Sequence, residues 1–386
     1  MRKVHSLSNI VFALAKGDKT LWDIPAEEQK IFLDSLTPPK DDIQRSFYQY
    51  KCQCIFVPKW KRLSRGILAA IAIPFIIIIA LIDRLFVKRE VPQKIIGQFF
   101  EYQELIPDEL SQMFLIKNSD WGKKMALSIK DVLFIIKHLC KYIYKPYFCF
   151  KCIWNLAKYR YYIHKYSPEI IADHAEFSCT SSFLTHYCNW QGIKHYNVMH
   201  GEKLFYIRDS FFRYDKCYVW DEFYKKLFIE LKAEDSQFVI EYPKSIVNLK
   251  NKTKKPSLYV DYRYYLQVPT IEQMKGILKS MEFARKQGKT VKYRLHPNHM
   301  DIEAVSIIPE DEIENPREID ILDSMVNSGC IIGSYTTTLT HAYFAGLNVV
   351  LDDVTYNAIY KKLNRYRYIL ASKNIRKLSD FYEKTT

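Results

Sequence analysis

Two short segments near the end of the chain carry residue types that suit the binding of a phosphate group. The first is His296-Pro297, which ends the run VKYRLHP. The second, GSYTTT over 333–338, stands between a predicted strand and a predicted helix. Hydroxyl and backbone N–H groups at a helix N-terminus form an anion site, and a histidine can donate a hydrogen bond or a proton to a phosphate. Together the segments predict a nucleotide-phosphate site that includes Gly333. Each segment taken singly also has a purely structural interpretation. The threonines would be N-cap residues of the following helix, and His296 would be a histidine that only stabilises the fold.

Acidic residues that suit a general base occur in an earlier part of the chain. The segment ADHAEFS places Asp173 and Glu176 at the end of a predicted strand. A general base must come within about 3 Å of the proton that it removes. We expect Asp173 to be this base, with Glu176 as the second choice and Glu202, two residues after His200, as a further candidate. The alternative is a solvated loop acid or the N-cap of the following helix.

From residue 168 onward, short β-like runs alternate with helical runs. The predicted strands are EIIADH, HYNVMHG, KCYVWD and QFVIEYP in a first block, and SLYVDY, TVKYRLHP, CIIGSY and NVVLDD in a second. This alternation predicts parallel sheets covered by helices on both faces, with ligands at the carboxyl ends of the strands. A polar, basic segment over 248–256 ends in proline and predicts a domain boundary.

We therefore expect an α/β protein with two Rossmann-like domains that face a cleft. The N-terminal, acceptor-binding domain is expected over 168–250, with parts of the region before it. The C-terminal, nucleotide-binding domain is expected over 256–386. Asp261, which ends the predicted strand SLYVD, should then lie at the edge of the cleft and contact the base or the ribose.

The first 167 residues predict a different kind of structure. Residues 1–65 are polar and read as helical. The 17 residues over 66–82 hold no charge, which is near the lower limit of about 17–25 residues for a membrane-spanning helix. Pro74 stands in their middle and favours a kink, and basic residues flank both ends, so charge predicts no orientation. We expect a kinked, re-entrant or monotopic membrane segment, with a buried core helix as the alternative.

Residues 132–167 hold no aspartate or glutamate and mix basic with aromatic side chains. This composition is typical of a membrane-interface surface and also of a platform for single-stranded nucleic acid. The apolar run before it favours the membrane, so 66–167 is expected to be a membrane-associating region. An ordinary basic helix pair is the alternative. The aromatic residues that we assign to this surface are Phe134, Tyr142, Tyr144, Tyr147, Phe148, Phe150, Trp154, Tyr159 and Tyr161.

The overall composition limits the classes of protein that fit. The chain has 386 residues, 48% of them hydrophobic, and a net charge of +14. That hydrophobic share excludes a disordered or collagen-like chain, and the charge suits an anionic partner. Nine cysteines without a recognisable signal peptide predict reduced thiols and a cytosolic location. Cys52/Cys54 and Cys149/Cys152 are loosely spaced for zinc, so we expect no metal.

The motifs of the second block resemble those of a known group of enzymes. YRLHP, followed by GCIIGSYTTTLTHAYFAGLNVVL, is similar to the nucleotide-binding half of bacterial GT-B-type glycosyltransferases that build surface polysaccharide. The pattern is most similar to sialyltransferases and polysialyltransferases that use CMP-sugars, and to capsule Kdo transferases. NVMHGEK and KCYVWDEFYKKL resemble the N-terminal half of capsule and teichoic-acid transferases. Those families contact CMP through an HP motif and a Ser/Thr motif, which match His296, Pro297, Ser334, Thr336 and Thr337 here.

The resemblance, which covers about residues 168–355, implies the transfer of a sugar, sialic acid or Kdo, from a CMP-sugar to a surface glycan such as capsule, lipooligosaccharide or O-antigen. It also implies a metal-independent, inverting reaction without a cofactor. This chain lacks the acidic pair followed by glycine that supplies the base in the sialyltransferase pattern.

With the apolar run and the basic charge, the resemblance predicts an enzyme at the cytoplasmic face of the inner membrane, peripheral or monotopic. Its partners would be a nucleotide-sugar donor, a glycan or lipid-linked acceptor, and anionic lipids. Two alternatives stay open: a GT-B-shaped nucleotide-sugar epimerase, and a non-catalytic, basic nucleic-acid-binding protein. The apolar run argues against the first, and the lack of an RRM, KH or helix-turn-helix signature argues against the second.

Overall fold

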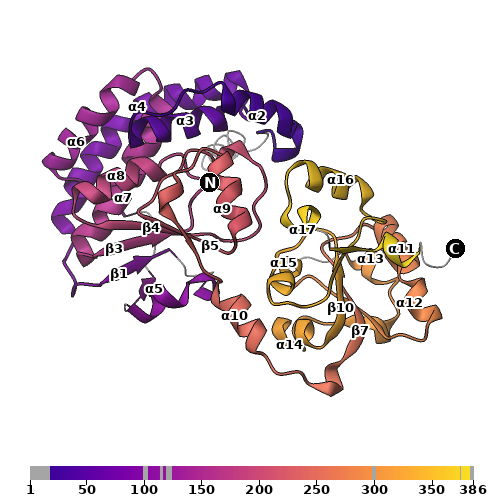
Figure 1. Ribbon diagram of the computed structural model, residues 1–386. Helices are drawn as coiled ribbons and strands as arrows, with labels where there is room; N and C mark the ends of the chain where they lie inside the picture. Colours follow the sequence, from indigo (N-terminus) through magenta and orange to yellow (C-terminus); the bar gives the residue numbers. More distant parts are fainter. Residues whose placement is uncertain are drawn as a thin grey trace, which may run out of the picture. The chain divides into compact units, whose positions relative to one another are not determined.

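The computed structural model describes residues 18–98, 103–113, 116–118, 124–297, 301–373 and 375–382. The chain divides into two compact units (Figure 1). Unit 1 comprises Met1–His200 and Tyr206–Glu241, and unit 2 comprises Gly201–Phe205 and Tyr242–Thr386. The main boundary therefore follows Glu241 and precedes the polar segment 248–256. Part of that segment belongs to helix α10 (Lys244–Asn251) of unit 2.

Unit 1 is built on a six-stranded parallel sheet. Its third strand in space, β3, is buried along its whole length, as expected for a parallel strand with both faces covered. All four strands predicted for the first block are present, and two further strands come from the region before residue 120. In spatial order the strands are β2 (Ile116–Asn118), β1 (Ile95–Gly97), β3 (Ile170–Asp173), β4 (Lys194–Val198), β5 (Lys216–Val219) and β6 (Phe238–Ile240).

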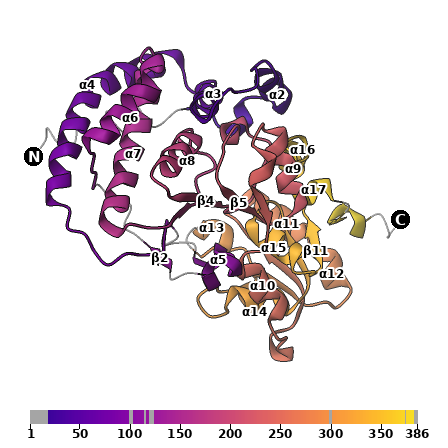
Figure 2. The same cartoon turned by 60° about the vertical axis from the view of Figure 1, so that its left-hand side comes forward.

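Among the helices of unit 1, α4 and α7 pack side by side (Figure 2). Local signals set several ends: the Asp41 side chain caps α3, the Ser128 side chain caps α6, and Gly192, at φ +76°, follows the C-cap of α8. The helices are α2 (Ala26–Asp34), α3 (Asp42–Cys54), α4 (Lys59–Asp83), α5 (Asp108–Met113), α6 (Ile129–Leu139), α7 (Pro146–Tyr166), α8 (Ser181–Trp190) and α9 (Glu222–Glu230).

Helix α4 is the apolar segment that the sequence singles out. It continues through Pro74 and, together with the turn that follows it, is long and apolar enough to cross a membrane. Only 17% of its most apolar window is buried inside the protein, and Phe75 is 61% exposed. The alternative of a buried core helix is therefore wrong. What the structure shows is one apolar helix with most of its surface uncovered.

The expected aromatic surface over 132–167 is wrong for five of the nine aromatic residues named for it. Helix α7 contacts both α4 and α8, so side chains on opposite faces of α7 are covered. The ring of Tyr142 lies 4.6 Å from that of Phe47 on α3, and helps to fill the core between these helices. The five buried residues are Phe134, Tyr142, Phe148, Tyr159 and Tyr161.

Unit 2 is built on a second six-stranded parallel sheet. Numbered along unit 2, its strands lie in the order 6-5-4-1-2-3, which is the Rossmann order. The α/β class with two parallel sheets is thus confirmed. In spatial order the strands are β12 (Arg376–Lys377), β11 (Val349–Leu351), β10 (Ser328–Gly333), β7 (Val260–Tyr265), β8 (Val291–Arg294) and β9 (Ile313–Glu314).

Helices connect the strands of unit 2, and its core packs side chains such as Tyr264, Met274, Ile277 and Ile332. Thr270 and Gln273 form a capping box at the start of α11. Besides α10, the helices are α11 (Ile271–Ser280), α12 (Glu282–Lys286), α13 (Ile302–Val305), α14 (Ile321–Val326), α15 (Thr337–Phe344), α16 (Asn357–Arg365) and α17 (Ile369–Ser372).

A buried charge network ties β7, β8 and β9 together in unit 2. Glu314 Oε2 lies 2.7 Å from Arg263 Nε, and Glu314 Oε1 lies 2.7 Å from Arg294 Nη1. Ser324 donates a further hydrogen bond of 2.5 Å to Glu314 Oε1. All four side chains are buried. Because Arg294 is the last residue of β8, the network fixes the strand that leads to His296.

Candidate functional site

The order of the strands in unit 2 reverses between β7 and β10, which are paired side by side. In open α/β sheets, ligands bind outside the carboxyl ends of the strands at such a switch point. Gly333 ends β10 there. A Cβ atom on Gly333 would lie 3.3 Å from Tyr265 O and 3.3 Å from Leu339 Cδ1. Glycine therefore lets strand β7 and helix α15 come close to the end of β10.

The segment after Gly333 leads directly into α15, as predicted. Thr336 is the N-cap residue, and its hydroxyl accepts a hydrogen bond of 3.3 Å from the N–H of Thr338. The N-cap role thus holds for Thr336, while Thr337 opens the helix. Ser334 is buried, and the ring of Tyr335 packs at 5.2 Å from that of Tyr368. We call the carboxyl ends of β7 and β10 with residues 333–338 the candidate phosphate site.

His296 and Pro297 follow the end of β8, which closes at Arg294. His296 is half-buried and Pro297 is exposed. Parallel pairing places this end at the same edge of the sheet as the end of β10, but β7 lies between the two strands. Neighbouring strands are about 4.8 Å apart, so the two strand ends are separated by roughly 10 Å. A phosphate that contacted both His296 and Ser334 would have to lie over the end of β7.

Asp261 does not lie where the sequence placed it. Strand β7 begins at Val260 and runs on to Tyr265, so Asp261 is its second residue and lies near the amino end. Its carboxylate accepts hydrogen bonds from Thr290 N at 2.9 Å and Thr290 Oγ1 at 2.8 Å, just before β8. These hydrogen bonds, together with Lys289 and against a smaller effect of burial, lower the pKa of Asp261. The expected contact with base or ribose is therefore wrong, because Asp261 stands at the opposite edge of the sheet.

Glu202 belongs to unit 2, although it follows a strand of unit 1 in the sequence. The hydroxyl of Thr340, in the first turn of α15, donates a hydrogen bond of 2.6 Å to Glu202 Oε2. An acidic group is favoured near a helix N-terminus by the helix dipole. The structure therefore brings Glu202, of the acids that the sequence nominated, next to the candidate phosphate site.

Asp173 ends β3, as predicted, but its side chain lies in a buried network. Asp173 Oδ2 accepts a hydrogen bond of 2.7 Å from the Tyr159 hydroxyl and lies 3.5 Å from His195 Nε2. Burial by itself would raise the pKa of Asp173. The hydrogen bond and charge of His195, with the hydrogen bond from Tyr159, outweigh burial and hold this pKa below its usual value. With only 3% of Asp173 exposed, this geometry favours a structural role over the expected role of general base.

Glu176 lies with two histidines near the carboxyl ends of β3 and β4. Glu176 Oε1 is 3.8 Å from His200 Nδ1, and Glu176 Oε2 accepts a hydrogen bond of 3.3 Å from Asn197 Nδ2. The ring centroids of His174 and His200 are 4.6 Å apart. Glu176 is fully buried, whereas a quarter of the His200 side chain is exposed. A partly exposed imidazole close to a buried carboxylate is an arrangement that suits a general base.

We call His174, Glu176 and His200 the acid–imidazole group. In the sequence analysis the two histidines served only to locate the neighbouring acids, and it was not predicted that His174 and His200 lie close together. The signal was present, because both histidines stand near the carboxyl ends of predicted strands of one parallel sheet. Gly201, at φ +62°, turns the chain directly after His200.

The structure also describes the nine cysteines, two pairs of which were weighed as zinc ligands in the sequence analysis. All nine cysteines are free thiols, and burial raises the pKa of Cys149 to about 11 and that of Cys52 to about 12. Among the residues that the structure describes, no three His, Cys, Asp or Glu side chains cluster in a way that would hold a metal ion. The absence of a metal remains a prediction.

Comparison with known proteins gives only distant structural similarity. No protein-family model matches the sequence, and no curated protein matches it. The wall teichoic acid polymerase TagF is 10% identical, with a TM-score of 0.42, over 85% of this chain and 88% of that chain. The glycotransferase of kitacinnamycin is 10% identical, with a TM-score of 0.45, over 74% and 86%. A UDP-N-acetylglucosamine 2-epimerase described as putative, from Listeria monocytogenes, is 11% identical, with a TM-score of 0.40, over 72% and 89%. These values are too low to assign an activity to this chain.

Proposed function

We propose that the chain is a glycosyltransferase that takes a sugar from a nucleotide-sugar donor. The observation that supports this function best is the Rossmann strand order of unit 2, with Gly333 and the N-terminus of α15 at its switch point. A phosphate at this helix end would gain about 0.3–1 kcal/mol from the helix dipole. Each hydrogen bond to the charged group would add about 1.5–3 kcal/mol. His296 would approach the same phosphate over the end of β7.

For the donor we propose a CMP-sugar carrying sialic acid or Kdo. The support is the similarity of YRLHP and GSYTTT to the CMP-contacting motifs of sialyltransferases and capsule Kdo transferases. The single phosphate of a CMP-sugar needs little neutralisation, so we propose a reaction without metal. The acceptor would be a surface glycan or its lipid-linked form.

On the acceptor side, we propose His200 as the general base in place of Asp173. Glu176, 3.8 Å from His200 Nδ1, would orient the imidazole and stabilise its charge after proton transfer. Glu176→Gln and His200→Ala should then each lower turnover by roughly 10²–10⁴-fold while nucleotide binding is retained. Unchanged turnover in both variants would refute this assignment.

We further propose that α4 attaches the protein to the cytoplasmic face of the inner membrane, in a peripheral or monotopic manner. The support is the exposed apolar surface of α4 and the net charge of +14, which suits anionic headgroups. Fractionation of cells that express the full chain tests this proposal. Full recovery in the soluble fraction at low salt, without detergent, would contradict it.

Thermal unfolding in the presence of CMP, UDP, GDP or CDP tests the donor site. A ligand at 100 times its dissociation constant adds about 2.7 kcal/mol of stability, which corresponds to roughly 5–10 °C for a unit of this size. We expect CMP to give the largest shift. His296→Ala should reduce the shift strongly and Thr337→Ala more mildly, whereas Thr253→Ala, an exposed threonine of unit 2, serves as the control.

The outcomes of this experiment separate the proposals. A larger shift in unfolding temperature with UDP than with CMP would indicate a UDP-sugar donor. The glycosyltransferase proposal would then still stand. No shift with any nucleotide would refute the donor site. Conversion of UDP-N-acetylglucosamine to its epimer without an acceptor would favour the epimerase alternative.

A further inference from the structure

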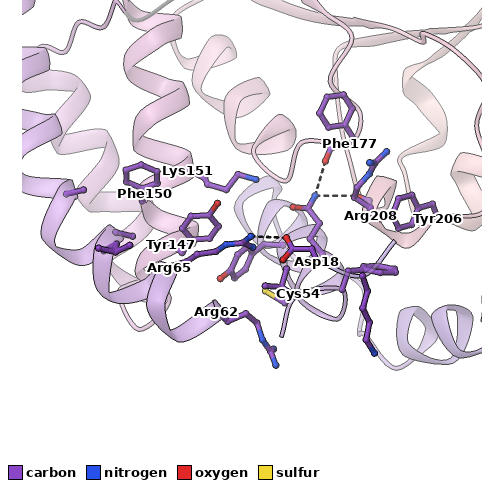
Figure 3. Close-up of a pocket in the computed structure, with 18 residues that line it drawn as sticks. Asp18, Cys54, Arg62, Arg65, Tyr147, Phe150, Lys151, Phe177, Tyr206 and Arg208 are labelled. Carbon is purple, nitrogen blue, oxygen red and sulfur yellow. Dashed lines mark hydrogen bonds and ion pairs between the residues drawn. The ribbon is translucent and has the colours of Figure 1, made fainter. Parts of the chain in front are cut away.

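Unit 1 contains a cavity of about 660 Å³ that is separate from both sites described above. It lies where α3, α4 and α7 meet the loops that follow β3 and β4 (Figure 3). Its lining is basic and aromatic, with five Lys or Arg side chains, one aspartate and six aromatic rings. We call it the headgroup cavity, for the ligand argued below. Its basic residues are Lys19, Arg62, Arg65, Lys151 and Arg208.

The charge of the headgroup cavity is compensated only in part: Arg208 forms an ion pair of 2.8 Å with Asp209, which lies outside the lining. Asp18, its one acidic residue, is shared by Arg65 at 2.9 Å and Lys61 at 3.5 Å. Within the described ranges, neither Arg62 nor Lys151 forms a salt bridge with a carboxylate. Figure 3 shows the contact between Arg65 and Asp18, and the side chain of Lys151, which reaches the cavity from α7. Two basic side chains that lack a carboxylate partner in the described part of the chain leave an electropositive pocket that suits an anion.

Aromatic rings line the cavity between these charges. The guanidinium carbon of Arg208 lies 4.5 Å from the ring centroid of Tyr206 and 5.4 Å from that of Phe177. The rings of Tyr147 and Phe150 stack at 6.2 Å on α7. Aromatic residues next to cations are typical of the level at which lipid headgroups lie. The lining of the cavity therefore suits an anionic group that is bonded to a hydrocarbon chain.

An apolar stripe leads away from the headgroup cavity along α4. Leu68 and Ala72 line the cavity, and Phe75, Ile79 and Ile82 continue the same face at helical spacing with 61%, 47% and 50% of their surfaces exposed. The 14 residue-to-residue steps from Leu68 to Ile82 span about 21 Å at 1.5 Å per residue. One leaflet of the hydrocarbon core of a bilayer is about 15 Å deep. The stripe is thus long enough to accompany a lipid chain through one leaflet.

We propose that the headgroup cavity binds the phosphate headgroup of an anionic membrane phospholipid, with the hydrocarbon chains along the apolar stripe of α4. The inference rests on the membrane association of α4 proposed above. Lys151 and Arg62 supply charge-assisted hydrogen bonds to the phosphate, and the aromatic rings cover the glycerol region. The positive charge excludes a zwitterionic lipid as the preferred occupant.

The position of the cavity also connects it to the acid–imidazole group. Gln49 on α3 donates a hydrogen bond of 2.8 Å to the main-chain oxygen of Glu176 and one of 3.0 Å to that of Arg208. Gln53, which lines the cavity, donates to Phe177 O at 2.9 Å. The loop that carries Glu176 is therefore tied to the helix that forms one wall of the headgroup cavity. A bound lipid would lie next to this loop.

The direct test is calorimetric titration of the full chain with a short-chain, water-soluble phosphatidylglycerol, and with the matching phosphatidylcholine. We expect binding of the anionic lipid only. Lys151→Gln should weaken it by about tenfold or more, the value of one charge-assisted hydrogen bond. Because Lys151 is half-buried, Arg62→Gln, at an exposed position, gives a second variant whose folding is not at risk. Thermal unfolding verifies the fold of each variant.

The matched control is Lys137→Gln, which removes one exposed charge from α6 beside the exposed side chains of Leu133 and Ile136. It should leave the affinity within about twofold of the wild-type value, since it only changes general surface charge. An equal loss in Lys137→Gln and Lys151→Gln would overturn the proposal. So would competition by inorganic phosphate as strong as that by the lipid, because the occupant would then be a free anion.

Flotation with vesicles separates this inference from the membrane proposal on which it rests. Vesicles of phosphatidylcholine alone test the insertion of α4, and vesicles that also contain phosphatidylglycerol add the headgroup. If the chain floats with both vesicles equally and does not bind the soluble anionic lipid, α4 inserts but the headgroup cavity is refuted. If it binds the soluble lipid and floats with neither vesicle, the membrane proposal fails instead.

Discussion

Replacing Asp173 by asparagine separates a structural role from a catalytic role for this carboxylate. Asparagine keeps the size of the side chain and removes its charge. The Tyr159 hydroxyl, which donates a hydrogen bond of 2.7 Å, and His195 Nε2, which lies 3.5 Å away, then lose their charged partner inside the protein. The structure predicts that Asp173→Asn mainly destabilises unit 1.

The magnitude follows from the buried contacts. A hydrogen bond to a charged group is worth about 1.5–3 kcal/mol, and the Tyr159 hydroxyl donates such a bond inside the protein. We expect a loss of about 3 kcal/mol at pH 7, which corresponds to roughly 6–12 °C in the unfolding temperature of a unit of this size. Because the pKa of Asp173 is lowered in the folded state, this stabilisation is present above the usual pKa and is lost as the pH falls through the folded-state pKa. The difference between variant and wild type should therefore narrow below about pH 4.

Urea unfolding at pH 7 and at several lower pH values measures this difference, and turnover is measured on the same samples. Glu169→Gln is the matched control, because Glu169 is exposed and precedes the same strand; its stability should equal that of the wild type. A fully stable Asp173→Asn variant whose turnover falls several hundred-fold would refute the structural role and restore Asp173 as the general base.

Three further predictions concern the sheet of unit 2 and helix α4. Glu314→Gln should destabilise unit 2 by about 3–5 kcal/mol, because Arg263 and Arg294 lose their buried counter-charge; urea unfolding measures this, and Glu310→Gln, at an exposed position, should have no effect. Gly333→Ala should lower the unfolding temperature and weaken nucleotide binding, because the added Cβ would lie 3.3 Å from a backbone oxygen; a variant with wild-type values would contradict the close packing at β10. Phe75→Asp should move the chain to the soluble fraction, since an aspartate at the centre of a membrane segment costs about 2.5–3.5 kcal/mol.

Eight of the strands from residue 170 onward were predictable because each is a short run of β-branched or aromatic residues bounded by turn residues, whereas β9 and β12, with two residues each, were not predicted. The paired strands β1 and β2 were not, because each has only three residues and lies outside the alternating pattern. The order of the strands within each sheet could not be predicted from the sequence either. Parallel alternation places all carboxyl ends at one edge, but it does not reveal that β7 separates β8 from β10.

The candidate site residues also divide into those that the local sequence places correctly and those that it does not. Gly333 and Thr336 were placed correctly, since a glycine at a strand end and a threonine before a helix act through their own backbone. Asp261 was misplaced because the run VDYRYY extends the strand beyond the predicted end, which moves the aspartate to the opposite edge. The aromatic residues of 132–167 were misjudged because composition does not tell which face of α7 meets α4 and which meets α8. Those contacts are tertiary.

The five residues Gly201–Phe205 have a consequence for dissecting the protein into fragments. They lie within the sequence of unit 1 but pack with unit 2, where Phe205 N donates a hydrogen bond of 2.7 Å to Tyr366 O and Glu202 accepts one from Thr340. A fragment that begins at Tyr242 would therefore lack a segment of its own fold and expose the groups that this segment covers. Neither unit can be excised as one continuous piece. Limited proteolysis between residues 201 and 241 should accordingly leave two products that stay associated until they are denatured.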